Sequence, residues 1–468
     1  MFNKKLALDI LNIATSTGAD FAEIFYEDTY SSYIGLEGLK VDSSSTANRN
    51  GIGLRILKGT QSVYGATSDL SKKSLYNFAS NLAKSFNGER IINELSSFED
   101  VKVKNIHKKY TPLMSVENNK IVDLLKKASG IVLSYDKRIV RCIAGFSITS
   151  TETEIFNSKG KHFKNKKEYG RLFINSVASE NGKIETRFDG PGAQGGWEFF
   201  TKELNVEELA KTNAEKVIMM LGAKECPTGK FPVVIGNGWG GVIFHEACGH
   251  QLEATSVAKG TSVFSNMKGE RIANECVSAF DDGSLPNERG SNSLDDEGKI
   301  PQCNQLIKDG ILVGYLVDDF NGRRMNEEGN GASRRESYKY EPTSRMSNTY
   351  IAPGKSKPED IIKDTKLGLY AVSFNGGSVD PSTGDFNFGC SEAYIIKDGK
   401  ILEPVRGATL VGNAKDILKH IDMVGNDLAF GQGMCGSVSG SIPVNVGQPT
   451  IRVDEIVVGG RGGSINEF

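Results

Sequence analysis

Hydrophobic and polar positions change period several times along the first part of this chain. Apolar residues between Leu6 and Ala14 recur at helical spacing, so the opening segment predicts an amphipathic helix rather than a signal peptide. Residues 21–30, 51–59 and 61–69 are rich in β-branched and aromatic side chains and are broken by Gly, Asn and Ser. This composition is typical of strands, and helical spacing returns immediately after them behind Ser71, a favoured N-cap residue.

The next part repeats the same order of elements. Residues 91–114 are polar, show little periodicity and predict a linker or surface excursion. A helix is predicted to start at Ser115, strands with hairpin-type turns fill residues 131–200, and a helix covers 206–221. Gly and Pro in residues 222–229 then mark a domain boundary.

The second half begins with a short apolar strand, "FPVVIG", a glycine-rich turn, "NGWGG", and a further helix. Residues 260–468 are mostly short strands and turns, such as 310–319, with one predicted helix over 413–424. We therefore expect an α+β fold. Residues 1–222 form an N-terminal α/β region of strands with flanking helices, divided into two units near 91–114, and residues 223–468 form a β-rich, Gly-rich domain.

Composition narrows the class of protein. Apolar residues make up 38% and charged residues 24% of the 468, which is ordinary for a soluble globular chain. The net charge of −2 gives no electrostatic reason to expect nucleic acid or an anionic membrane as the main partner. Seven cysteines without a CxxC pair indicate no disulfide framework and favour a reducing, cytoplasmic location, and no apolar run is long enough for a membrane span.

The candidate chemistry lies in "FHEACGHQLE", residues 244–253, which holds two of the five histidines. His245 and Glu246 match the start of the zinc-protease helix motif, but His250 follows at a spacing of five instead of four. On a regular α-helix two such side chains differ by about 140° around the axis. A π-bulge at Gly249 would bring both rings to one side and allow a metal site. The alternative is that the two histidines merely pack on a core helix.

A metal site requires a third ligand, and the residues leave this choice open. Glu253 lies on a similar helix face to His250, and Cys435 lies in the glycine-rich "FGQGMCGSVSG", read as a loop. His420 is better explained as a surface residue of the predicted helix, and Cys248 as a small buried side chain. The remaining cysteines are interpreted as structural: Cys142, Cys226, Cys276, Cys303 and Cys390.

Several longer segments carry a resemblance. "GNGWGGVIFHEACGHQLEA", "FDDGSLPNERGSNSLDDEG", "GATLVGNAKDIL", "MVGNDLAFGQGMCG" and "PVNVGQPTIRVDEIVVGG" resemble the TldD/TldE (PmbA) family of metalloproteases, once described as modulators of DNA gyrase. The C-terminal half matches nearly throughout and the first 220 residues more loosely. The resemblance is to the metal-carrying TldD subunit. It implies one zinc per chain held by His245, His250 and Cys435, with Glu246 as catalytic acid/base.

The resemblance also implies a function. It predicts a zinc metallopeptidase that hydrolyses peptides or unfolded chains bound as extended strands, working as a homodimer or with a non-catalytic TldE/PmbA-like subunit. The rival interpretation is a regulatory protein, acting on gyrase or a toxin–antitoxin pair, with a structural metal. In "RRESYKYEPTSRMSNTY", Arg335, Tyr338 and Asn348 are candidates for binding substrate, against a surface ion-pair cluster around Arg335. The "DDEG" stretch, residues 295–298, is predicted as a solvated turn.

Overall fold

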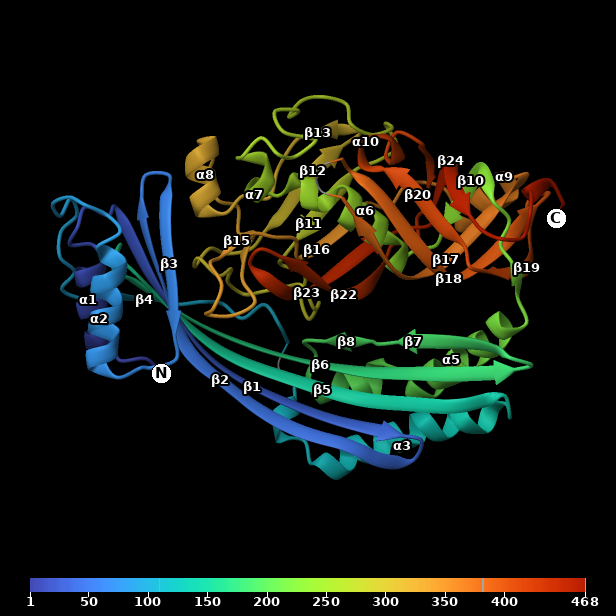
Figure 1. Ribbon diagram of the computed structural model, residues 1–468, viewed down its shortest axis with the longest axis horizontal. Helices are drawn as coiled ribbons and strands as arrows, with labels where there is room; N and C mark the ends of the chain where they lie inside the picture. The colour runs from blue at the N-terminus through green and yellow to red at the C-terminus, as the bar shows by residue number, and fades with distance from the viewer. Residues whose placement is uncertain (109, 381–382, 468) are drawn as a thin grey trace.

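The computed structural model describes residues 1–108, 110–380 and 383–467. The first half of the chain builds one long curved sheet, and the second half lies above it as a more compact, strand-rich body (Figure 1). Within the described residues no helix is long and apolar enough to cross a membrane. The α+β class, with a strand-rich C-terminal region, is confirmed.

The N-terminal sheet has the order β3-β2-β1-β5-β6-β4, with β7 and β8 also paired to β6. Its strands are β1 (Phe21–Glu37), β2 (Lys40–Lys58), β3 (Gln61–Thr67), β4 (Glu99–Val101), β5 (Ile139–Asn157), β6 (Lys161–Glu180), β7 (Lys183–Asp189) and β8 (Gly192–Ala193). Its helices are α1 (Lys4–Ala14), α2 (Lys72–Ala83), α3 (Asn118–Tyr135), α4 (Gly196–Glu198) and α5 (Val206–Leu221), with a 3-10 turn at Leu113–Ser115 and a π-helical segment at Phe199–Glu203.

The long strands contribute to two separate hydrophobic cores. Near its start β1 supplies Ile24 to a core under α1 and α2, and near its end it supplies Leu36 to a core under α3 and α5. Between them lies the polar stretch "EDTYSSY". The predicted strand 21–30 is therefore too short, because pairing with β2 and β5 continues through polar residues that periodicity alone does not assign.

The C-terminal half contains two larger sheets. One has the order β17-β10-β24-β20-β18-β19-β9 with β21 on β24, and the other β13-β12-β11-β16-β23-β22. The strands are β9 (Lys224–Glu225), β10 (Gly229–Ile235), β11 (Ala279–Asp282), β12 (Cys303–Lys308), β13 (Ile311–Leu312), β14 (Ser333–Arg334), β15 (Thr343–Ser344), β16 (Asn348–Ile351), β17 (Leu367–Val379), β18 (Asp385–Lys397), β19 (Lys400–Arg406), β20 (Thr409–Asn413), β21 (Ile421–Val424), β22 (Ala429–Ser437), β23 (Gly440–Gln448) and β24 (Ile451–Gly459).

Short helices connect the strands of these sheets. They are α6 (Val242–Ala247), α7 (Ala254–Val257), α8 (Asp319–Met325), α9 (Pro358–Asp364) and α10 (Ala414–Ile417), with 3-10 turns at Trp239–Gly241, Gly249–Leu252 and Ile465–Glu467. The predicted helix 413–424 is wrong beyond α10, because residues 421–424 pair with β24 as β21. The predicted strand 310–319 is reduced to β13, and the chain then enters α8.

Buried ion pairs join the two halves. Arg55 on β2 contacts Glu23 of β1 at 3.1 Å and Glu297 of the C-terminal half at 2.7 Å, and all three side chains are 1% exposed. Asp295 and Asp296, beside Glu297, are also buried. The prediction of a solvated turn at 295–298 is thus wrong. Glu297 faces Arg55 across the contact between the halves, and Asp295 and Asp296 accept backbone N–H groups of Lys299 and Arg335 within the C-terminal half.

Candidate metal centre

The first two candidate ligands lie where the chain changes from one helix type to another. α6 ends at Ala247, Cys248 adopts φ −116° and ψ −44°, and a 3-10 turn starts at Gly249. The predicted π-bulge is therefore wrong: the turn is tightened rather than widened, and the helix is interrupted at Cys248. The interruption redirects the chain, so His245 and His250 lie with ring centroids 5.2 Å apart and planes at 81°.

Gly249 has a packing role at this break. A Cβ atom built on it would lie 2.2 Å from Sδ of Met346. Its φ is not in the left-handed region, so the glycine is required by the close approach of Met346 and not by an unusual backbone conformation.

The third candidate comes from β22, almost two hundred residues further along the chain. Cys435 Sγ lies 3.1 Å from Nε2 of His250, and donor atoms of His245, His250 and Cys435 all fall within 4.8 Å of one another. Cys435 does not lie in a loop as its glycine-rich surroundings suggest, because β22 pairs regularly with β23 as a hairpin.

The glycines of β22 make room for an indole ring. A Cβ atom on Gly431 would lie 2.6 Å from the Trp239 ring, and one on Gly433 would lie 3.2 Å from it. Trp239 Nε1 in turn donates to the carbonyl of Phe374 at 2.9 Å. Trp239 lies just before α6, so its packing fixes the cysteine-bearing strand against the histidine-bearing segment.

The electrostatics of the cluster favour a thiolate. Burial by itself raises the pKa of the Cys435 thiol, but His245 and His250 outweigh it and lower that pKa to about 3. Burial likewise lowers the pKa of His250, whereas Glu253 and Cys435 raise it, and the result lies well above the ordinary histidine value. The cluster therefore pairs an anionic sulfur with a protonated His250, and a metal that bound there would displace that proton.

Glu253 lies behind His250 and does not join the ligand group. Its Oε1 lies 3.2 Å from Nδ1 of His250, the ring nitrogen opposite the one that faces Cys435. Carboxylates in this position fix the orientation and tautomer of a metal-ligating imidazole. Of the two third ligands left open by the residues, the geometry gathers Cys435 with the histidines and leaves Glu253 as a positioning residue.

Arg345 is a residue that the sequence does not single out. It is fully buried, and it donates to the carbonyl of Cys435 at 2.6 Å and to Ser439 and Gly440 in the β22–β23 turn. Its Nε lies 3.9 Å from Glu253. In the sequence it stands out only as an arginine within a stretch rich in serine, threonine and asparagine. That setting does not reveal its contact with Cys435, ninety residues further along the chain.

Glu246 borders the cluster on its more open side. Its Oε2 lies 3.8 Å from Nε2 of His250, and its side chain is 30% exposed. His420 lies elsewhere, next to Asp454 on the surface. Cys248 is fully buried with its thiol towards the carbonyl of Ala414, as expected for a structural cysteine.

The structure disperses the three candidate substrate-binding residues. Arg335 is buried against Glu23 at 2.8 Å, and Tyr338 packs in the small core beside β1. Asn348 is fully buried and holds Gly290, Asp282 and Ser291 by hydrogen bonds. The alternative of a surface cluster does not describe Arg335 either, because its charge lies inside the contact between the halves. Each of the three has a structural role, and their part in substrate binding remains a prediction.

The cluster defines the chain as a candidate metalloenzyme, because two imidazoles and a thiolate beside a partly exposed carboxylate are a donor set for a transition metal. Three family models match the chain: the PmbA/TldA metallopeptidase domain 1 over residues 22–85, the central domain over 112–221 and the C-terminal domain over 228–460. The chain belongs to this PmbA/TldD family of metallopeptidases.

Individual relatives support this assignment. The chain is 34% identical to the metalloprotease TldD homolog of Buchnera aphidicola from Schizaphis graminum, over 94% of this chain and 93% of that protein. It is 35% identical to the metalloprotease TldD homolog of Haemophilus influenzae, over 97% and 95% of the two chains. The resemblance seen in the sequence motifs is therefore confirmed, and the protein is a metallopeptidase.

Solved structures share the fold. A putative modulator of a DNA gyrase from Thermotoga maritima superposes with a TM-score of 0.76 at 21% identity, covering 94% of this chain and 96% of that one. TldE from Thermococcus kodakarensis gives a TM-score of 0.75 at 19% identity, covering 94% and 97%. At these identities the likeness concerns the architecture.

Proposed function

We propose that this metallopeptidase is zinc-dependent, with His245, His250 and Cys435 holding one zinc ion per chain and Glu246 acting as general base. The observation that carries the proposal is the convergence of these three donors from α6, the following 3-10 turn and β22. The alternative of a regulatory protein with a structural metal gains no support from a chain whose relatives are named metalloproteases.

The donor set fits zinc. Nδ1 of His245 is buried and has no hydrogen-bond partner among the described residues, so an imidazole nitrogen there is left without a protein acceptor. Zinc bonds of about 2.0–2.3 Å to nitrogen and sulfur can join donor atoms at the observed separations after small side-chain movements. Thiolate and imidazole ligands favour zinc over magnesium or calcium.

The chain's own groups provide the remaining chemistry. When bound, zinc would polarise the scissile carbonyl and lower the pKa of a water molecule. Glu246 is partly exposed and beside the ligand group, which supports assigning its carboxylate the role of accepting a proton and returning it to the leaving amine. Glu253 holds His250 from behind, which keeps the ligand nitrogen directed at the cluster.

The substrate is proposed to be a peptide or unfolded chain bound as a strand. β22 is the edge strand of its sheet, and along its free edge the described residues form only the bridge between Gly238 and Phe430. An open edge pairs with any peptide backbone, so selection by side chains would be weak. The likeness to a TldE structure supports, as a further part of the proposal, a non-catalytic partner subunit or a homodimer.

The test is Glu246→Gln in the full chain, with any copurifying partner retained. The variant should bind zinc like the unaltered protein and lose cleavage of an unfolded peptide, because the amide cannot take up the proton. Arg141→Gln, a change at an exposed ion pair on β5, serves as the matched control and should keep both properties. Cleavage by Glu246→Gln, or cleavage by the unaltered protein after complete removal of zinc, would refute the mechanism.

A further inference from the structure

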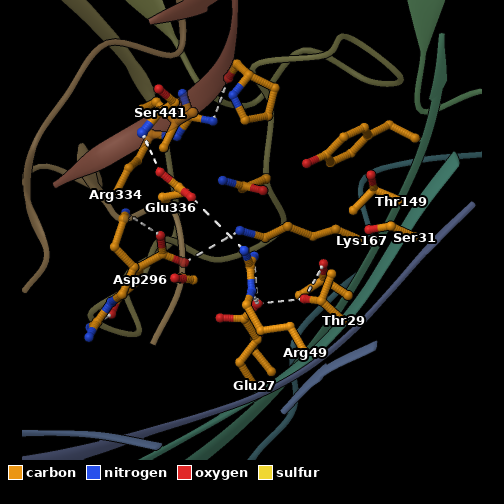
Figure 2. A pocket seen from close by; sticks show the side chains of 18 of the residues that line it. Glu27, Thr29, Ser31, Arg49, Thr149, Lys167, Asp296, Arg334, Glu336 and Ser441 are labelled. Atoms are coloured by element: carbon orange, nitrogen blue, oxygen red, sulfur yellow. Dashed lines mark hydrogen bonds and ion pairs between the residues drawn. The ribbon is translucent and has the colours of Figure 1, made fainter. Parts of the chain in front are cut away.

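A cavity of about 270 Å³ lies between the long N-terminal sheet and the C-terminal half. Figure 2 shows its two sides: hydroxyl side chains of the long strands, including Thr29, Ser31 and Thr149, face Glu336 and Asp296 of the C-terminal half. Arg49 and Lys167 reach from the sheet towards those carboxylates (Figure 2). The cavity is therefore lined by hydrogen-bonding groups on both sides.

The cavity has an excess of positive charge. Its lining contains five cationic side chains and three carboxylates, which are Arg49, Lys167, Arg289, Arg334, Arg335, Glu27, Asp296 and Glu336. Four of the five cations have oxygen partners, namely Arg49 with Glu27 at 2.9 Å, Lys167 with Asp296 at 3.4 Å, Arg335 with Glu23 at 2.8 Å, and Arg334 with the carbonyls of Met346 and Pro443 at 2.6 and 2.7 Å. Arg289 is the exception.

Arg289 is 6% exposed, and its Nε and Nη1 have no hydrogen-bond partner among the described residues. Its Nη2 contacts Sδ of Met434 at 3.2 Å, a weak acceptor. Burial, with Arg171 and Arg334 adding to it, lowers the pKa of Arg289 to about 10, so the guanidinium is still charged at neutral pH. A buried charge without a partner is costly, and a bound anion would remove that cost.

The cavity shares the β22–β23 hairpin with the candidate metal centre. Met434, which touches Arg289, directly precedes Cys435, and Ile442, the cross-strand neighbour of Cys435, also lines the cavity. Side chains alternate along a strand, so Met434 points away from Cys435, and it is 51% exposed. The cavity and the candidate metal centre therefore adjoin the same hairpin, and Met434 lies on the cavity side of it.

We propose that this cavity binds a carboxylate of the peptide substrate, either its free C-terminus or an acidic side chain, with the Arg289 guanidinium as the anchoring donor. The proposal rests on the peptidase function above and names a substrate preference for it. A guanidinium offers two parallel N–H donors to a carboxylate along either of two edges. In Arg289 each edge combines one unpaired nitrogen, Nε or Nη1, with Nη2, whose only contact is the weak acceptor Sδ of Met434. Threonine hydroxyls on the opposite wall can complete the contacts.

The experiment compares three pools of N-acetylated peptides of mixed sequence. The first pool has free C-terminal carboxylates and no acidic side chains, the second has C-terminal amides and no acidic side chains, and the third has C-terminal amides and one Glu. The unaltered protein should cleave the first or the third pool with a lower KM than the second, and the preferred pool identifies the source of the carboxylate.

Arg289→Gln should raise KM for the preferred pool about tenfold or more and leave its kcat nearly unchanged. Cleavage of the second pool, which has no carboxylate, should also be nearly unchanged. Arg289→Lys keeps the charge without the planar pair of donors, so it should recover part of the preference. Arg141→Gln should behave like the unaltered protein. Removal of an unpaired charge should not lower the melting temperature of Arg289→Gln, which separates loss of binding from loss of folding.

Two results would overturn the proposal while leaving the peptidase function intact. One is equal cleavage of all three pools by the unaltered protein, and the other is a preference that Arg289→Gln retains. Cleavage of none of the pools by the zinc-loaded protein would instead overturn the proposed peptidase function, and the carboxylate site with it.

Discussion

The contact between Glu253 and His250 allows a quantitative test of the candidate metal centre. Glu253 Oε1 lies 3.2 Å from Nδ1 of His250, and the Glu253 side chain is 5% exposed, so solvent screens this contact little. Loss of an outer-shell partner typically weakens metal binding about 10–100-fold, which corresponds to about 1.4–2.7 kcal/mol. Glu253→Gln keeps the shape and an acceptor oxygen, so we expect about tenfold weaker zinc binding, and Glu253→Ala should approach 100-fold.

The assay is competition for zinc against a chromophoric chelator at fixed pH. Glu246→Gln is the matched control, because it removes the same charge from the same neighbourhood without breaking a contact to Nδ1 of His250. Thermal unfolding of the zinc-free variants reports any effect of leaving buried Arg345 with less negative charge nearby. Equal zinc affinity for Glu253→Ala and the unaltered protein would refute the positioning role, and an equal loss in Glu246→Gln would reduce it to a general charge effect.

Three further changes have defined outcomes. Cys435→Ser should lower zinc content in the purified protein by more than either Glu253 variant, measured by elemental analysis, and unchanged zinc would remove the thiolate from the ligand set. Gly249→Ala should lower the free energy of unfolding in urea by about 1–3 kcal/mol, since its Cβ would lie 2.2 Å from Met346 Sδ. The double variant with Met346→Ala should lose less than the sum of the two single losses, and additive losses would contradict the overlap. Burial, with Asp296 adding to it, raises the pKa of Asp295 to about 7, so the folded state holds a proton that the unfolded chain releases near pH 4. Its contribution to stability should therefore fall as pH rises from about 4 to 7, and the free energy of unfolding of Asp295→Asn, measured over that range, should lose this slope.

Elements with strong local signals are predictable from this sequence. The helix over residues 206–221 agrees with α5, whose first turn is capped by Asn205 and contains two glutamates, and Gly222 follows its end. Alternation and turn residues likewise identify β5 and β6, because the hairpin between them buries one face. These signals are all contained within twenty residues of sequence.

The errors come from contacts between distant segments. Glycine is depleted in ordinary strands, so the glycines around Cys435 do not predict one. They occur in β22 because Trp239 packs on that strand. The carboxylates at 295–297 look solvated until Arg55, from the other half of the chain, is placed against them. The glycine that follows the break at Cys248 is explained in the same way, by the close approach of Met346. Residue types indicated the two histidines but left Cys435 and Glu253 open as the third candidate ligand, and the family resemblance favoured Cys435. The geometry of the candidate ligands is fixed by partners that no local pattern identifies.

The position of β24 within its sheet has a consequence for the order of folding. This strand, Ile451–Gly459, lies between β10 and β20. β10 leads into the turn and helix that carry both histidines, so the strand that supports this segment comes from more than two hundred residues further along the chain. Pairing between such distant segments is slow compared with local structure, so the centre is expected to assemble late in folding.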